Sequence, residues 1–188
     1  GSVEQKRSFL LGSLDELRPF LHLTSDGDFV LEVAWLVGAL RYRGPYPLLV
    51  LSGDPGSAKS TSARVLRRTI DPNLADLRAE PKEIRDLVIA ANNGRVVALD
   101  NLSRVQPWLS DALCRLATGG GLGMRRLYSD DEEQLFDVQR PIILTGIGDV
   151  ATRPDLLDRA LLLRLPRVEK VKTEEELWAD FERELPRV

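Results

Sequence analysis

Short runs of consecutive apolar residues recur along the chain, and the longer segments between them carry apolar residues at every third or fourth position. Runs without polar alternation are typical of strands that are buried on both faces of a parallel sheet, whereas the longer spacing is typical of helices. Strands that alternate with helices predict a three-layer α/β domain. The five expected strands are residues 48–52, 74–78, 95–100, 141–146 and 160–165.

Helices are expected before, between and after these strands. Pro81 and Pro107 stand where two of the inter-strand helices begin, which is a favoured place for proline. The expected helices are residues 3–21, 28–40, 59–70, 81–93, 106–118 and 173–185. The pattern divides the chain into an N-terminal helical segment (1–44), a core (45–168) and a C-terminal helix (169–188).

One segment interrupts the alternation just before the fourth expected strand. A glycine-rich stretch at 119–123 is followed by two short polar runs, 124–129 and 134–138, on either side of the acidic turn 130–133. Two short runs around a turn predict a β-hairpin. Because its strands are polar and short, we expect the hairpin to project from the sheet.

The composition limits the chemistry that the chain can perform. It has 188 residues, of which 43% are hydrophobic and 29% charged, as expected for a soluble globular domain. Cys114 is the only cysteine and His22 the only histidine, which excludes disulfide frameworks and Cys/His zinc sites. Cys114 is expected to be buried and inert, and His22 to have a capping or surface role.

Charge and hydropathy set expectations about location and partners. No apolar run is long enough to cross a bilayer, so a cytoplasmic location without membrane contact is expected. The net charge of −3 lacks the basic excess of a dedicated nucleic-acid binder. This argues against DNA binding by the chain as a whole, while a local basic patch stays compatible with it.

Residues 53–61 join the first expected strand to a helix and carry the strongest motif in the chain. They follow the pattern G-x-x-x-x-G-K-[ST], except that Ala58 replaces the second glycine. In such a loop, backbone N–H groups hold phosphates at a helix N-terminus, a lysine reaches the outer phosphates and a hydroxyl binds magnesium. The alternative is a Gly-Pro turn before an ordinary helix with a surface lysine. The expected ATP-binding residues are Gly53, Asp54, Pro55, Gly56, Ser57, Ala58, Lys59, Ser60 and Thr61.

An acid at the end of a buried strand would complete a magnesium site with this loop. Asp100 ends the run 95–100, and with the Ser60 hydroxyl it forms a pair of hard oxygen ligands for Mg²⁺. The alternative is an aspartate that caps the following loop. Asn101 stands where such hydrolases usually carry a glutamate that polarises the attacking water. An amide orients water but does not accept its proton, so we expect slow turnover or a base from elsewhere.

The phosphate motif with its alanine resembles that of the minichromosome maintenance helicases, an AAA+ family in which alanine takes this place and the site still hydrolyses ATP. Residues 113–147 are similar to the region of superfamily-three phage and plasmid helicases before the fourth strand, and residues 46–166 follow the AAA+ order of five strands. The chain also resembles bacterial and phage ATP-binding proteins with a VALDNLS-like strand. The resemblance implies a P-loop ATPase fold with its C-terminal lid absent or truncated, ATP and Mg²⁺ as ligands, single- or double-stranded DNA as a partner, and a homo-oligomeric, hexameric ring.

The resemblance assigns roles to further residues. Thr145 lies at the sensor-one position, where it would contact the γ-phosphate or the attacking water; the alternative is a threonine that fills a strand end. Arg159 resembles the arginine finger that acts on a neighbouring subunit, with Arg153 as the second choice and a surface ion pair as the alternative. On the hairpin, the acidic turn would repel phosphates, so a solvated hairpin is the alternative to DNA binding. The expected nucleic-acid contacts there are Arg125, Arg126 and Tyr128.

Three functions are compatible with these residues. The first, favoured by the motifs, is an ATP-hydrolysing motor domain of a DNA helicase or replication protein from a phage, plasmid or mobile element. The second is a nucleotide-dependent switch or assembly module with little hydrolysis, which Asn101 and the acidic hairpin favour. The third is a P-loop kinase, for which the sequence offers neither a lid nor an acceptor pocket. The catalytic set of the motor would be Lys59, Asp100, Asn101, Thr145 and Arg159.

Overall fold

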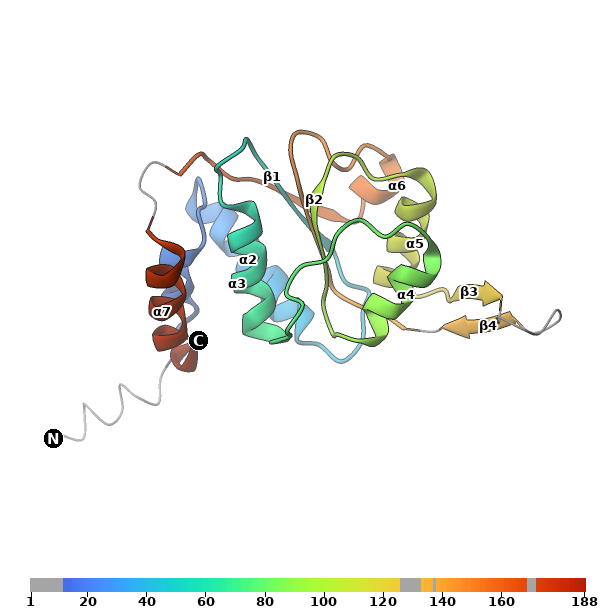
Figure 1. Ribbon diagram of the computed structural model, residues 1–188, viewed down its shortest axis with the longest axis horizontal. Helices are drawn as coiled ribbons and strands as arrows, with labels where there is room; N and C mark the ends of the chain where they lie inside the picture. The colour runs from blue at the N-terminus through green and yellow to red at the C-terminus, as the bar shows by residue number, and fades with distance from the viewer. Residues whose placement is uncertain (1–11, 126–132, 137, 169–171) are drawn as a thin grey trace, which may run out of the picture.

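The computed structural model describes residues 12–125, 133–136, 138–168 and 172–188. In this part of the chain a parallel sheet lies between two layers of helices (Figure 1). Its strands are β1 (Leu48–Ser52), β2 (Val97–Leu102), β5 (Ile142–Gly146) and β6 (Ala160–Arg164). They are arranged in the order β2-β5-β1-β6, so that β1 and β5 are central.

Several helices begin at local sequence signals, whereas the helix expected to begin at Pro81 begins at Ile84, without a side-chain cap. The Ser25 side chain accepts a hydrogen bond from the backbone N–H of Asp28 at the first of them, and Thr173 and Glu176 form a reciprocal capping box at the last. Pro107 occupies the first turn of a third helix. The helices are α2 (Asp26–Ala39), α3 (Lys59–Ile70), α4 (Ile84–Asn92), α5 (Pro107–Thr118), α6 (Pro154–Leu157) and α7 (Glu174–Glu184), with 3-10 helices η1 (Leu14–Phe20) and η2 (Leu185–Arg187).

Successive residues of each strand enter opposite faces of the sheet and build two hydrophobic clusters. Leu48 and Val50 of β1 join the cluster that α4 and α5 cover. Leu49 and Leu51 join the cluster formed with η1, α2, α3 and α7. All four side chains are buried, which explains why the strands lack polar alternation. The prediction of a three-layer α/β domain with a parallel sheet is confirmed.

The prediction of a fifth strand at residues 74–78 is wrong. Only Arg78 pairs with the sheet, through a single parallel bridge to Leu99. Leu74 is fully exposed, and the Asp76 carboxylate accepts a hydrogen bond from Arg68 at 2.7 Å. In a strand these two side chains, two residues apart, would share one face, where a leucine and a charged aspartate have opposite needs for burial. The segment instead crosses the edge of the sheet at one residue.

The first expected helix also differs from its prediction. Residues 1–11 lie outside the described residues, and the segment that follows, η1, is a 3-10 helix of seven residues. Pro19 lies inside it and has no backbone N–H to donate, which disfavours a continued α-helix. The other expected helices are present within a few residues of their predicted ends.

The hairpin expected before the fourth strand is present. Strands β3 (Leu122–Arg125) and β4 (Glu133–Phe136) pair antiparallel and extend from the end of the molecule opposite α7 (Figure 1). Arg125 ends β3, whereas Arg126 and Tyr128 lie outside the described residues.

Across the described ranges, the helices are too short or too polar to span a membrane.

Candidate nucleotide-binding site

The loop of residues 53–58, called the glycine loop here, connects the end of β1 to the start of α3. Gly53 needs the absence of a side chain, since a Cβ there would lie 2.6 Å from the Leu165 carbonyl oxygen. Gly56 has a φ of +81°, a left-handed value that glycine adopts without strain. The loop therefore keeps a narrow backbone path over the amino-terminal end of α3, where unpaired N–H groups favour an anion.

Ala58 is the residue at which the chain turns into α3, and it has the left-handed conformation that the missing glycine would adopt. Its φ is +58° and its ψ is +24°, and its carbonyl oxygen accepts the hydrogen bond from the Ser62 N–H at 2.9 Å. A left-handed conformation costs a residue with a Cβ about 1–2 kcal/mol. The alanine thus preserves the backbone path of the loop at an energetic cost.

Lys59 holds its ammonium group over the glycine loop. Its Nζ donates to the carbonyl oxygens of Gly53 at 2.8 Å and Asp54 at 2.9 Å, and to the Ser57 hydroxyl at 3.1 Å. Partial burial lowers the pKa of Lys59, while the carboxylates of Asp54 and Asp100 act to raise it. The hydrogen bonds hold the Lys59 ammonium group against the glycine loop, where the outer phosphates of a nucleotide would bind.

Asp100 connects three elements at this edge of the sheet. Its Oδ1 accepts a hydrogen bond from the Ser60 hydroxyl at 2.7 Å and another from the Thr145 hydroxyl at 2.5 Å. The Thr145 hydroxyl in turn accepts the backbone N–H of Asn101 at 2.9 Å. The structure thus joins the first turn of α3, the end of β2 and the end of β5 into one polar cluster.

A β-bulge places this cluster. Leu99 pairs with Leu144 and Leu102 with Gly146, so two residues of β2 stand opposite the single residue Thr145 of β5. Asn101 supplies the extra residue, with a left-handed φ of +57° that asparagine tolerates better than most side chains. Thr145 therefore holds Asp100 in place through its hydroxyl.

The oxygen atoms of this cluster fit a magnesium ion only together with phosphate. Among the residues that the structure describes, His, Cys, Asp and Glu side chains form no group of three that could hold a metal. Ser60 and Asp100 supply two hard oxygen atoms that already lie within hydrogen-bond distance of each other. This donor set suits Mg²⁺, which proteins commonly bind through one carboxylate, waters and the phosphates of a substrate.

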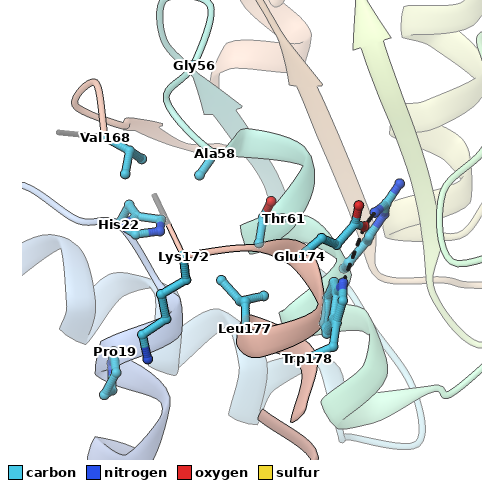
Figure 2. A pocket seen from close by; sticks show the side chains of 11 residues that line it. Pro19, His22, Gly56, Ala58, Thr61, Val168, Lys172, Glu174, Leu177 and Trp178 are labelled. Carbon is cyan, nitrogen blue, oxygen red and sulfur yellow. Dashed lines mark hydrogen bonds and ion pairs between the residues drawn. The ribbon is translucent and has the colours of Figure 1, made fainter. Parts of the chain in front are cut away.

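A pocket of about 490 Å³ opens beside the glycine loop (Figure 2). Gly56, Ala58 and Thr61 form one side, and α7 forms the side opposite with Leu177. The N-terminal segment adds Pro19 and His22, and the chain before α7 adds Val168 and Lys172; the remaining lining residues are Arg64 of α3 and Glu174 and Trp178 of α7. The pocket is therefore continuous with the phosphate end of the site and mixed in polarity.

Of the residues that line this pocket, the sequence predicted Gly56, Ala58 and Thr61 as ligand-binding residues but missed the others. His22 was expected to cap a helix or lie on the surface, but it lines the pocket, and burial lowers its pKa so that the neutral imidazole is favoured. Leu177 and Trp178 belong to the C-terminal helix, whose apolar face was the only available signal. Nothing in their spacing shows that this helix returns to the glycine loop.

Helix α7 is fastened to α3 by charged and aromatic contacts. The Glu174 carboxylate accepts hydrogen bonds from Arg64 at 3.0 Å and from the Trp178 indole N–H at 3.4 Å. The Arg68 guanidinium lies over the Trp178 ring, 4.1 Å from its centroid. On its other side α7 meets η1, where the Phe20 and Phe181 rings pack edge to face.

Arg159, the first candidate arginine finger, lies away from the glycine loop of its own chain. Arg159 directly precedes β6, whose first residue Ala160 stands opposite Leu48 at the start of β1. With about 3.3 Å per residue, the length of β1 separates it from the loop by roughly 17 Å. Arg153 forms ion pairs with Asp111 and Asp155.

The comparison with protein families gives a match over nearly the whole chain. Residues 14–188 match the model of the family described as "Actinomycete integrative conjugative element replication protein". The chain belongs to this family. The RepA family of these elements thus places the domain among replication proteins, in agreement with the mobile-element part of the sequence prediction.

Solved structures share the fold of this RepA domain. Two structures described as the apo form of the NrS-1 C-terminal region superpose with TM-scores of 0.60 and 0.59, each at 13% sequence identity. They cover 95% and 96% of this chain, which spans 46% of each of those chains. At such identity the likeness shows a common fold. No curated protein matches the chain.

Proposed function

We propose that the chain is the ATP-binding and ATP-hydrolysing domain of a mobile-element replication protein. The observation that carries the proposal is the meeting of Lys59, Ser60, Asp100 and Thr145 at the amino-terminal end of α3. A cation, two hard oxygen atoms and a row of backbone N–H groups converge there. This combination suits a nucleoside triphosphate with magnesium.

Each residue of the cluster has a separate task in this proposal. The Lys59 ammonium exchanges its loop carbonyls for phosphate oxygens, and the glycine loop surrounds the phosphates with N–H donors. Ser60 and Asp100 would hold Mg²⁺, which neutralises charge on the phosphate oxygens when it is bound. Thr145 orients the Asp100 carboxylate through its hydroxyl, so it positions the metal ligand and need not touch the nucleotide.

The pocket beside the loop accepts the nucleoside end of the same ligand. Its volume of about 490 Å³ lies within the range of small-molecule sites, roughly 300–1,000 Å³. His22 and Leu177 offer a ring and an apolar side chain for a base. His22→Ala and Leu177→Ala are expected to weaken ATP binding and leave the binding of inorganic tripolyphosphate unchanged. An equal loss for both ligands would contradict a role in base binding.

The test of the phosphate site compares two lysine variants by calorimetric titration with ATP·Mg. Lys59→Ala removes a charged donor from the phosphates and is expected to weaken binding about tenfold or more. Lys82, which is exposed on the surface, provides the matched control, and Lys82→Ala is expected to bind as the wild type does. Unchanged binding by Lys59→Ala would refute the site.

A nucleotide-dependent switch with little hydrolysis is the second candidate, and Asn101 is the observation that favours it. Its side chain is an amide at the place of a general base, and it is exposed in the bulge of β2. The two candidates differ in turnover. Phosphate release measured at high protein concentration, with and without single-stranded DNA, supports the motor when it exceeds that of Lys59→Ala and supports the switch when it does not.

A ring of copies remains part of the motor proposal because Arg159 is distant from the loop of its own chain. In a ring this arginine would act on a neighbour's nucleotide. Lys59→Ala and Arg159→Ala are each expected to abolish hydrolysis, and a mixture of the two is expected to regain part of it, since each supplies what the other lacks. A mixture as inactive as the single variants would refute action between subunits.

A further inference from the structure

Arginines gather at the edge of the sheet where the parallel strands begin, which is the edge opposite the glycine loop. Arg41 and Arg43 precede β1, Arg95 precedes β2 and Arg140 precedes β5. Arg43, Arg95 and Arg140 line a pocket of about 240 Å³, and Arg41 lies beside it in the chain. The residues that line it are Tyr42, Arg43, Arg95, Val138, Gln139 and Arg140. We call this the arginine edge.

The positive charge of the arginine edge is not neutralised by carboxylates of the described residues. Arg95 donates to the carbonyl oxygens of Ala39 and Arg41, and Arg140 donates to those of Ala91 at 2.8 Å and Gly94 at 3.0 Å. Carbonyl groups fix the orientation of a guanidinium but leave its charge in place.

Arg41 is also held by a carbonyl group, and the nearby carboxylate of Asp71 is already bonded to other groups. Arg41 likewise donates to the Pro45 carbonyl oxygen at 2.5 Å. Asp71, the carboxylate at this end of β2, accepts from Arg67 and from the backbone N–H groups of Arg95 and Val96.

Two side chains of the arginine edge, Tyr42 and Arg43, are exposed to solvent and, among the described residues, lack the carbonyl partners that hold the other guanidinium groups. Tyr42 is 87% exposed, and it has no aromatic or hydrogen-bond partner among the described residues. Arg43 is exposed and forms no ion pair or hydrogen bond with them either. An exposed aromatic ring beside uncompensated cations is the combination that binds unpaired bases and their phosphates.

The loop that carries Tyr42 is joined to the root of the β3–β4 hairpin. The Gln139 side chain accepts the Gly44 N–H at 2.9 Å and donates to the Thr118 carbonyl oxygen at 2.9 Å. The arginine edge therefore lies beside the hairpin, and the loop keeps its place relative to the end of α5.

We propose that the arginine edge binds single-stranded DNA, with the phosphates at the arginines and one base stacked on Tyr42. The membership of the chain in a replication family favours DNA over an acidic protein segment as the occupant. A single strand is favoured over a duplex because stacking on a protruding ring requires an unpaired base. The site is separate from the glycine loop, so DNA and nucleotide do not compete for it.

The experiment titrates the full chain into a fluorescein-labelled oligothymidine of about 16 nucleotides and follows anisotropy at low salt without nucleotide. Tyr42→Ala is expected to weaken binding about tenfold or more, and Tyr42→Phe to retain the wild-type affinity because stacking needs only the ring. Arg43→Ala is expected to weaken binding several-fold. It is also expected to flatten the dependence of log affinity on log salt by ~0.7, the value for one phosphate contact on a single strand.

Control variants separate this site from general charge effects and from the nucleotide site. Arg104 is exposed after β2, at the opposite edge of the sheet, and Arg104→Ala makes the same charge change as Arg43→Ala. Arg104→Ala and Lys59→Ala are both expected to bind the oligonucleotide as the wild type does. Losses equal to that of Arg43→Ala, displacement by polyglutamate as readily as by unlabelled oligothymidine, or a wild-type chain that does not bind would each overturn the proposal.

Discussion

Replacing Ala58 by glycine is expected to stabilise the protein, although it deletes a methyl group at the start of a helix. Ala58 has a φ of +58°, and this conformation costs a residue with a Cβ about 1–2 kcal/mol, which glycine does not incur. The larger freedom of glycine in the unfolded chain offsets roughly 0.4–1 kcal/mol of that gain. The free energy of unfolding is therefore expected to rise by about 0.5–1 kcal/mol, or roughly 1–4 °C in Tm for a chain of this size.

The matched control is the same substitution in a right-handed part of the chain. Ala179 is exposed in the interior of α7, so Ala179→Gly changes helix propensity with little change in packing. It is expected to lower the free energy of unfolding by about 1 kcal/mol. The two variants differ in sign because Ala58 and Ala179 occupy opposite regions of backbone conformation.

Urea denaturation followed by circular dichroism, with thermal melts of the same samples, measures both variants against the wild type. An Ala58→Gly variant destabilised as much as Ala179→Gly would refute the left-handed conformation of Ala58 and with it the backbone path of the glycine loop. ATP binding gives a second readout. Ala58→Gly is expected to keep it, since removal of a methyl group leaves the phosphates at least as much room.

Three further predictions concern the core and the polar cluster. Glu32 is buried, and this burial, reinforced by Asp28, raises its pKa to about 8. The folded chain therefore keeps a proton that the unfolded chain has lost, so stability falls as pH rises from about 5 to 8, by up to ~1.4 kcal/mol per pH unit. Urea midpoints at several pH values should show this slope and its loss in Glu32→Gln; an equal slope in both proteins would contradict the assignment. Thr145→Val removes one of the two hydroxyl groups that donate to Asp100, leaves the Asn101 N–H without its acceptor, and is expected to cost about 1–3 kcal/mol in urea denaturation, whereas Thr145→Ser should stay near wild type. Gly53→Ala forces a Cβ to 2.6 Å from the Leu165 carbonyl oxygen and is expected to lower stability by about 1–3 kcal/mol, so a wild-type Tm would show that the loop relaxes freely.

The pattern of apolar residues along the chain predicted the strands of the central sheet, because their burial depends on the sequence of each strand. The apolar runs of β1, β2, β5 and β6 are found where they were expected; those of β1, β2 and β5 are buried on both faces, whereas the edge strand β6 leaves Leu162 exposed. The run at 74–78 failed because two leucines in five residues resemble a strand, while the charged Asp76 is satisfied by Arg68 outside any sheet. Composition alone does not reveal that partner.

The candidate site was only partly visible in the sequence. The order of loop, lysine and serine is a local pattern, and the structure brings Ser60 and Asp100 together as that pattern predicts. The hydrogen bond from Thr145 to Asp100 depends on a β-bulge at Asn101, and the residue types in β2 do not predict that bulge. The pocket wall depends on the packing of η1 against α7, which no local pattern predicts.

That packing has a consequence for the order of events during synthesis. The glycine loop, β2 and β5 belong to the middle of the chain, so the phosphate end of the site can form once they pair. The pocket proposed for the nucleoside needs His22, which the ribosome makes early, and Leu177, which it makes more than a hundred and fifty residues later. The domain acquires its complete pocket only when α7 docks against α3 and η1, so ligand binding at that pocket reports a fully folded protein.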